Sequence, residues 1–296
     1  GESDPSVLDD ETSGRPAWYP VRVSVDALDR LSGGSLVVPE WRTPTDAAIV
    51  ERAAALYPPL SAPDGWSVRF GRELNATDDR ALFGAPGAGV PVIEGKHLEP
   101  FGVRVGASHR SVKAAVASAR LGQRWQRPRL AYRDVAGATN RLTLIAAILP
   151  AGVVSTHTLT CLRTPLSLER QHLLCGLFNS LVVNYLVRFR VGTHVTTDLV
   201  ERLPLPRQAD APEDAAAIAS LARRARASGG RDDGAEWRGM ELERFGALNA
   251  RVARLYRLSR EELAHVLDTF PLVPAGDRAC VLEHFDRQGA CPDGHA

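Results

Sequence analysis

The feature that most constrains the fold of this 296-residue chain is a long amphipathic segment over residues 168–190. Its apolar side chains recur every three or four positions, a spacing that places them on one face of a helix. They are Leu173, Leu174, Leu177, Phe178, Leu181, Val182, Tyr185, Leu186 and Phe189. A helix with so broad an apolar face must pack on another element, so we expect it to cover a sheet.

The residues before this segment predict that sheet. Short runs rich in Val, Ile and Leu, bounded by Gly, Pro or Asn, are typical of strands. They occupy residues 66–70, 90–93, 102–105, 130–133, 142–149 and 153–162, with a turn at residues 150–152. Helices are predicted at 45–57, in the Ala/Arg-rich stretch that ends at Arg226, and at 237–256 and 260–270. Together these elements predict an α+β fold.

Composition changes divide the chain into three parts. We expect a polar linker at 1–17, a β-rich body at 18–206 and a helical C-terminal region at 207–296. Residue 1 is Gly rather than Met, so we expect the chain to begin inside a longer polypeptide. There is no run of about 18 apolar residues and no signal-peptide pattern, which predicts a cytoplasmic protein with no membrane partner.

The cysteines predict neither a disulfide framework nor a metal site. No Cys-x-x-Cys pair is present, and we interpret all of them as reduced thiols. They are Cys161, Cys175, Cys280 and Cys291. His172 and Cys175 could share one face of a helix, but a single pair is more typical of packing than of a metal centre.

Basic side chains are concentrated in the middle of the chain, although the net charge is only +1. Residues 96–141 hold ten basic side chains against two acidic ones, a local charge of +8. The basic residues are Lys96, Arg104, Arg110, Lys113, Arg120, Arg124, Arg127, Arg129, Arg133 and Arg141. Such an excess is typical of a surface that meets phosphates, although a solvated basic face gives the same pattern.

Motifs for catalysis are weak. Methyl transfer to a base amino group uses an acidic or amide residue before Pro-Pro-aromatic, whereas residues 57–60 read Tyr-Pro-Pro-Leu. The Gly/Ala/Pro segment at 84–89 precedes a predicted strand and does not open a helix, so it is no cofactor loop. Asp79, Glu94 and Lys96 imitate the acid and acid-x-lysine set of a metal-dependent nuclease, and this alternative stays open. We assign no catalytic residue and no metal ligand.

Several ordered blocks resemble a known family. The segments WSVRFGRELNATDD at 66–79, VIEGKHLEPF at 92–101 and YRDVAGATNR at 132–141 are similar to the TaqI-like target-recognition domains of type IIG and phage-defence adenine-specific DNA methyltransferases. The segments LIAAILP at 144–150, LFNS at 177–180 and RLPLP at 202–206 continue the likeness, as does the stretch 255–271. It covers about residues 18–285. Leu142 departs from the family pattern, which favours Arg there.

The resemblance implies a module that reads double-stranded DNA in a sequence-specific way. It also implies an upstream catalytic methyltransferase domain, outside this chain, that transfers a methyl group from S-adenosylmethionine to the N6 amino group of adenine. No cofactor is expected in this chain itself. A protein-interaction domain whose basic face is incidental is the second alternative.

Twelve basic or polar side chains of the β-rich body are the candidate DNA contacts, because such groups bind phosphates or base edges. They are Lys96, His97, Arg104, Arg124, Arg129, Arg133, Asn140, Arg141, Thr143, His157, Thr193 and His194. Asn140 and Arg141 are the leading candidates for reading bases, since Asn pairs with adenine and Arg with guanine.

A first prediction follows from the missing motifs. The chain alone should bind no S-adenosylmethionine and transfer no methyl group, because it has neither the amino-group motif nor the glycine loop. Isothermal titration calorimetry with the cofactor measures this directly. Binding in the micromolar range would show that a catalytic domain lies within these 296 residues.

Overall fold

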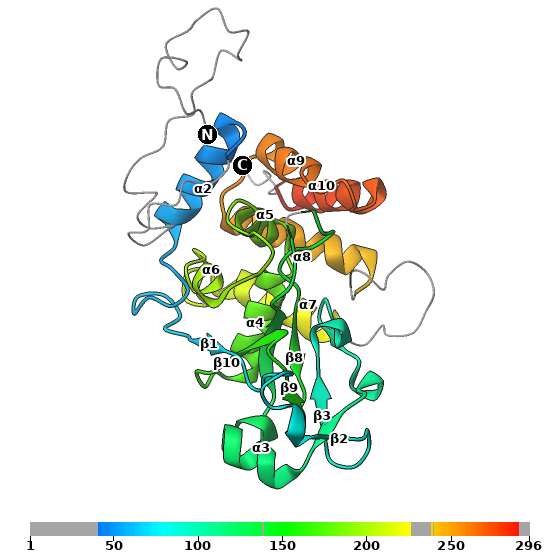
Figure 1. Cartoon of the computed structure of the whole chain (residues 1–296). Coiled ribbons are helices and arrows are strands. Elements are labelled where there is room, and N and C mark those ends of the chain that lie inside the picture. The colour runs from blue at the N-terminus through cyan, green and yellow to red at the C-terminus, as the bar shows by residue number, and fades with distance from the viewer. Residues whose placement is uncertain (1–40, 138, 226–237, 239, 290–296) are drawn as a thin grey trace, which may run out of the picture.

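The computed structural model of the chain describes residues 41–137, 139–225, 238 and 240–289. The predicted linker at 1–17, the first part of the predicted β-rich body at 18–40 and Cys291 lie outside these residues. Short strands gather at one end of the molecule and helices at the other, so the predicted α+β class is confirmed (Figure 1).

The central sheet has four antiparallel strands in the order β1-β10-β7-β8. These strands are β1 (Phe70–Gly71), β10 (Leu159–Leu162), β7 (Arg129–Arg133) and β8 (Ala146–Leu149). In β7 the side chains alternate between two cores, as the pleat of a strand requires. Leu130 and Tyr132 face the helices, whereas Ala131 faces a smaller core with Leu159 and Cys161.

A second sheet lies beside the first in the order β2-β6-β3-β9. Its strands are β2 (Phe83–Gly84), β6 (Ser111–Val112), β3 (Val90–Ile93) and β9 (Val154–Ser155), and its apolar side packs on α3 (Ala114–Leu121). A third pair consists of β4 (Leu98–Glu99) and β5 (Gly102–Val103). The turn at 150–152 is confirmed, and Gly152 adopts the positive φ of 82° that favours glycine. This turn leads the chain from β8 in one sheet to β9 in the other.

The predicted single helix over 168–190 is wrong, because the structure has two helices there. These are α4 (Leu168–Phe178) and α5 (Leu181–Arg188). Asn179 ends α4 by donating from Nδ2 to the Cys175 carbonyl, and the Ser180 hydroxyl caps α5 by accepting from Val183 N–H. Periodicity continues through the break because both helices bury their apolar faces in the same core.

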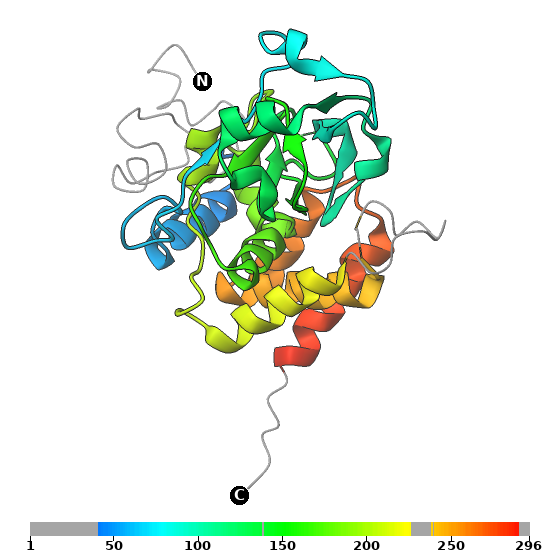
Figure 2. The same cartoon turned by 90° about the horizontal axis from the view of Figure 1, so that it is seen from below.

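The remaining helices surround these two. They are α2 (Pro44–Leu56), α6 (Thr197–Glu201), α7 (Pro212–Ala225), α8 (Leu242–Leu255), α9 (Arg260–Asp268) and α10 (Ala275–Gly289). From the central sheet outward, α4 is followed by α7, then α8, then α10 (Figure 2). The helix α10 was not predicted, because only a few of its residues are large and apolar. One core runs from Tyr132 in the sheet to Leu248 and Val266, so the C-terminal helices pack directly on the β-rich body.

Four predicted strands are longer than the observed ones, and segment 102–105 forms a strand only at Gly102–Val103. Only Phe70 of segment 66–70 lies in a strand, and segment 142–149 pairs only from Ala146 onward. Segment 153–162 is split, because residues 156–158 form a turn between β9 and β10. In segments 66–70 and 142–149, partners from distant parts of the chain replace the hydrogen bonds of a strand. The Trp66 indole donates to the Pro206 carbonyl, and the Asn184 side chain accepts from Thr143 N–H.

A buried carboxylate ties three helices together. Asp46 closes the capping box of α2 and accepts hydrogen bonds from the Tyr185 hydroxyl at 2.5 Å and from His265 Nε2 at 2.7 Å. Burial raises the pKa of Asp46, but the bonds from His265, Tyr185 and the cap outweigh it and hold the pKa below its ordinary value of 3.8. The ionised form is therefore the one that stabilises the fold.

The second prediction concerns acid stability. Because folding lowers the pKa of Asp46, its contribution is complete above the unfolded value and is lost as the pH falls through the folded one. Urea unfolding of Asp46→Asn and the parent chain should therefore show a gap in unfolding free energy that is largest above about pH 5 and shrinks below about pH 4. Asp268→Asn, at an exposed carboxylate, is the control. An equal gap at pH 3 and pH 7 would contradict the assignment.

Candidate nucleic-acid interface

Four loops meet at one end of the central sheet, which we call the loop end. They are residues 94–97, 134–141, 156–158 and 191–195. The carbonyl of Thr158 accepts from Asp134 N–H at 3.0 Å, and its hydroxyl accepts from Gly95 N–H at 2.8 Å. The carbonyl of Asp134 accepts from Val195 N–H at 2.7 Å. Backbone hydrogen bonds therefore hold segments up to 100 residues apart in one fixed group.

A buried carboxylate orients one of the predicted contacts. Asp134 is 3% exposed and accepts from Arg72 Nη2 at 3.2 Å, and its other partner is His194 Nδ1 at 2.9 Å. With Nδ1 donating to this carboxylate, the imidazole presents Nε2 as an acceptor, and half of the side chain is exposed. Sequence reasoning missed Arg72, because nothing in the sequence links it to a residue 62 positions away.

Asn140 and Arg141 lie at the tip of the loop 134–141 and are exposed. The Asn140 side-chain oxygen accepts from Gly137 N–H at 2.6 Å, and the backbone N–H of Asn140 donates to the Gly137 carbonyl at 3.1 Å. Arg141 donates from Nε to the Leu272 carbonyl at 3.0 Å. These bonds fix the loop and place both side chains at the protein surface, where base-reading groups must lie.

Arg188 fastens this loop to the helices behind it. Its guanidinium donates to the carbonyls of Asn140, Arg141 and Thr269, and it lies 3.8 Å from the centre of the Phe270 ring. Burial lowers the pKa of Arg188 to about 10, which leaves the side chain charged at neutral pH. The position of the loop therefore depends on the last residue of α5 and on the segment after α9.

Basic side chains of the loop end are held in exposed ion pairs. Lys96 Nζ lies 2.8 Å from Glu94, which also meets Arg110 at 3.5 Å, while Arg104 pairs with Glu99 at 2.8 Å. Glu94 lies just outside the stretch that carries the +8 charge, so the local excess is smaller than the sequence count indicates. The cationic partners in these pairs are exposed, whereas Glu94 is 19% exposed, and ion pairs near the surface contribute little, about 0–1 kcal/mol.

His157 and Thr193 complete the group. His157 lies in the turn between β9 and β10, not within a strand as predicted, and its Nδ1 accepts from Ala76 N–H at 3.0 Å. Thr193 is exposed beside His194. Val135, which pairs with His194 across the two loops and is 60% exposed, adds an apolar contact that sequence reasoning missed.

Four of the twelve candidate residues are turned inward, and we withdraw them as DNA contacts. Thr143 is fully buried, and His97 accepts from Glu94 N–H in a site where burial lowers the pKa of its imidazole. Arg129 forms two bonds to Glu73, at 2.6 and 2.7 Å. Arg133 is half-buried and donates to the Leu98 carbonyl.

Arg124 lies at the opposite end of the sheet. In the antiparallel register of β7 and β10, Arg133 stands opposite Leu159 at the loop end, so Arg129 and Leu162 lie at the far end. There Arg124, Arg127 and Arg163 line a pocket of about 290 Å³ whose other walls are mostly apolar. The two ends are about 13 Å apart, the length of four residues in a strand. The structure thus divides the basic stretch between two places.

The nuclease set does not assemble into one charged centre. Asp79 accepts from Asn75 N–H and pairs with Arg120, whereas Glu94 pairs with Lys96 and Arg110. Strand β3 ends at Ile93, and residues 95–97 form a 3-10 turn, so Glu94 and Lys96 do not project from one strand as the nuclease arrangement requires. Each carboxylate has its own cationic side chain, so Asp79, Glu94 and Lys96 do not form the shared metal centre of a nuclease.

Comparison with known proteins finds similarity in structure but not in sequence. No protein-family model and no curated protein matches the sequence. Among solved structures, the chain is similar to the Type IIL restriction-modification enzyme MmeI, solved in complex with DNA, with 11% identity and a TM-score of 0.44. The match covers 76% of this chain and 36% of that enzyme. A likeness at this level says nothing about the function of this chain.

Separately, no helix in the described ranges is both long enough and apolar enough to cross a membrane.

The third prediction tests the role of Arg188. Arg188→Met should lower the free energy of unfolding by about 2–4 kcal/mol, because it leaves several carbonyls without their charged donor. Amide exchange in residues 134–144 should rise more than in the central sheet. Arg202→Met, which breaks an exposed pair with Asp198, is the matched control and should change stability by less than about 1 kcal/mol. Unchanged exchange in the loop would show that Arg188 does not fix it.

Proposed function

We propose that this chain is a recognition module for double-stranded DNA and that the loop end is its contact surface. The observation that carries the proposal is the convergence of seven candidate residues on one end of one sheet. They are Lys96, Arg104, Asn140, Arg141, His157, Thr193 and His194. Sequence reasoning selected these residues individually, and they come from segments far apart in the chain.

The surface combines the two kinds of group that DNA recognition needs. Lys96 and Arg104 lie on adjacent turns, linked by a bond from Arg104 Nη2 to the Lys96 carbonyl, and are suited to phosphates. Asn140, Arg141 and His194 offer donors and acceptors that suit base edges in the major groove. The exposed methyl groups of Val135 suit the methyl group of thymine.

Rigidity supports the same proposal. The loops are held by backbone bonds, by the Asp134 carboxylate and by the Arg188 guanidinium, so their side chains are positioned before any partner binds. A positioned set of contacts reduces the ordering cost of binding and improves discrimination between sites.

We further propose that the parent enzyme is an adenine-N6 DNA methyltransferase of a restriction-modification or phage-defence system. This finer assignment rests on the resemblance of the blocks at 66–79, 92–101 and 132–150 to TaqI-like recognition domains. The S-adenosylmethionine site and the catalytic residues then belong to an upstream domain outside this chain.

The fourth prediction divides the surface into phosphate-binding and base-reading parts. Lys96→Ala and Arg104→Ala should weaken binding to all duplexes alike and reduce the salt dependence by about one counterion each. Asn140→Ala and Arg141→Ala should cost about 1–3 kcal/mol on the preferred site and little on a scrambled duplex. The preferred site comes from selection of a randomised duplex library with the full chain, and fluorescence anisotropy over a salt series gives the affinities.

Two further variants set the limits of the surface. Arg224→Ala, at an exposed residue of α7 in the helical part, is the control and should leave binding unchanged. Arg124→Ala reports whether the contact reaches the far end of the central sheet. Equal losses for all four loop-end variants on both duplexes would refute the division of roles. Unchanged binding in all four would show that the loop end does not meet DNA.

A further inference from the structure

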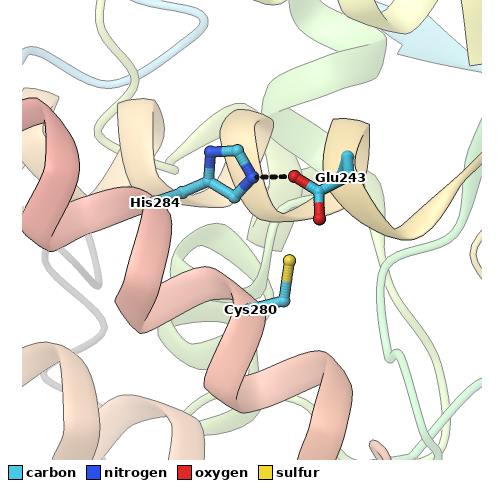
Figure 3. A group of neighbouring side chains, drawn as sticks. All are labelled: Glu243, Cys280 and His284. Atoms are coloured by element: carbon cyan, nitrogen blue, oxygen red, sulfur yellow. Dashed lines mark hydrogen bonds and ion pairs between the residues drawn. The ribbon is translucent and has the colours of Figure 1, made fainter.

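Three side chains of types that bind metals lie together between two C-terminal helices. In sequence, they follow all the segments that form the loop end. Figure 3 shows Glu243 on α8 with Cys280 and His284 on α10. Their ligand atoms all lie within 4.8 Å of one another, and His284 Nε2 is 2.9 Å from the Glu243 carboxylate. Within the described parts of the chain, no other group of three or more His, Cys, Asp or Glu side chains is arranged in this way.

We infer that Glu243, Cys280 and His284 bind a divalent transition-metal ion of the zinc class, with solvent as the fourth ligand. Cys280 and His284 are four residues apart on one helix, which places both side chains on the same face. A thiolate, an imidazole nitrogen and a carboxylate oxygen are the three ligand types that Zn²⁺ takes in proteins. Thiolate and imidazole favour Zn²⁺ or Co²⁺ over Mg²⁺ and Ca²⁺, which prefer oxygen ligands alone.

The packing of the two helices supports this inference independently of the ligand types. Gly246 lies on α8 opposite both ligands of α10: a Cβ atom there would stand 2.5 Å from the His284 ring and 2.7 Å from the Cys280 sulfur. Any larger residue would therefore push α10 away. The glycine lets the two side chains approach α8 closely enough to share one ion with Glu243.

The ligand atoms, which now lie up to 4.8 Å apart, must move to hold an ion, the most distant of them by roughly an ångström. Zn–S distances of about 2.3 Å and Zn–N distances of about 2.0 Å separate the ligand atoms of a tetrahedral site by roughly 3.2–3.6 Å. The present contact between His284 and Glu243 must open by a few tenths of an ångström, and Glu243 is exposed and can move. On binding, the Cys280 thiol gives its proton to solvent and its sulfur donates an electron pair to the ion.

The ion has to compete with one neighbouring cation. Arg287 lies 4.0 Å from the Glu243 carboxylate and 3.2 Å from Glu283, and it is exposed. Its partner Glu283 is on the same helix, so Arg287 keeps an ion pair when Glu243 turns to the metal. The bound ion would fasten α10 to α8 and so stabilise the C-terminal helices.

The test uses the full chain, freed of metal with a chelator and titrated with Zn²⁺, Co²⁺ and Mg²⁺. We expect one Zn²⁺ or Co²⁺ per chain, a rise in the melting temperature, and a near-ultraviolet sulfur-to-cobalt band, with no response to Mg²⁺. Each of Glu243→Gln, Cys280→Ala and His284→Gln should weaken binding by at least about 100-fold, since even losing an outer partner of a metal ligand costs 10–100-fold.

The variants also separate ligation from folding. Cys280→Ala should abolish the cobalt band, whereas Glu243→Gln alters only an exposed side chain and should keep the band at high Co²⁺ while lowering affinity. Glu241→Gln, at another exposed carboxylate beside α8, is the matched control and should bind normally. Absence of the cobalt band in the parent chain, or unchanged affinity in both Glu243→Gln and Cys280→Ala, would overturn the inference.

Discussion

Two buried asparagines support the rest of the structure, because they connect the central sheet to its helices. Asn179 accepts from Ala146 N–H and donates to the Ala146 carbonyl, as a neighbouring strand would. Asn184 accepts from the N–H groups of Thr143 and Leu144 and donates to the Leu144 carbonyl. Both amides are almost fully buried, so their bonds are made in a medium where an unpaired polar group is costly. Asn179 marks the end of α4, and the two asparagines together hold the backbone just before and at the start of β8.

This connection also sets the position of the candidate interface. The backbone just before β8 is held by Asn184, and the loop tip before it is held by Arg188 one turn later on the same helix. The loop 134–141 is therefore held in place by α5, although the side chains at its tip are exposed. The same arrangement links the loop to the C-terminal helices, because the guanidinium that donates to the Asn140 carbonyl also donates to the carbonyl of Thr269 beyond α9. The candidate interface is therefore held by side-chain bonds from the core behind it.

Many basic side chains of this protein form ion pairs with neighbouring carboxylates. Arg129 is buried against Glu73, and the exposed cations Lys96, Arg104 and Arg110 each lie beside a carboxylate. The buried pair is structural, since separating it would leave a charge without a partner inside the protein. The surface pairs keep this face close to neutral, and under the proposed function phosphates would take the place of the carboxylates. A DNA-binding role and a net charge of +1 are thus compatible.

The sequence by itself determined the α+β class, the helices at 45–57 and 260–270, and the strands at 90–93 and 130–133, because their periodicity and their end signals are local. It also singled out the side chains that meet at the loop end, since residue type shows which groups can bind phosphates or bases. Local pattern could not show the break at Asn179, whose cause is a bond to Ala146, or the burial of Thr143 and Arg129. Nor could it show that Arg124 lies near the far end of the central sheet, away from the loop end, or that Cys280 and His284 meet Glu243. Each of these depends on which distant segment supplies the partner, and strand register and helix packing decide that only when the chain has folded.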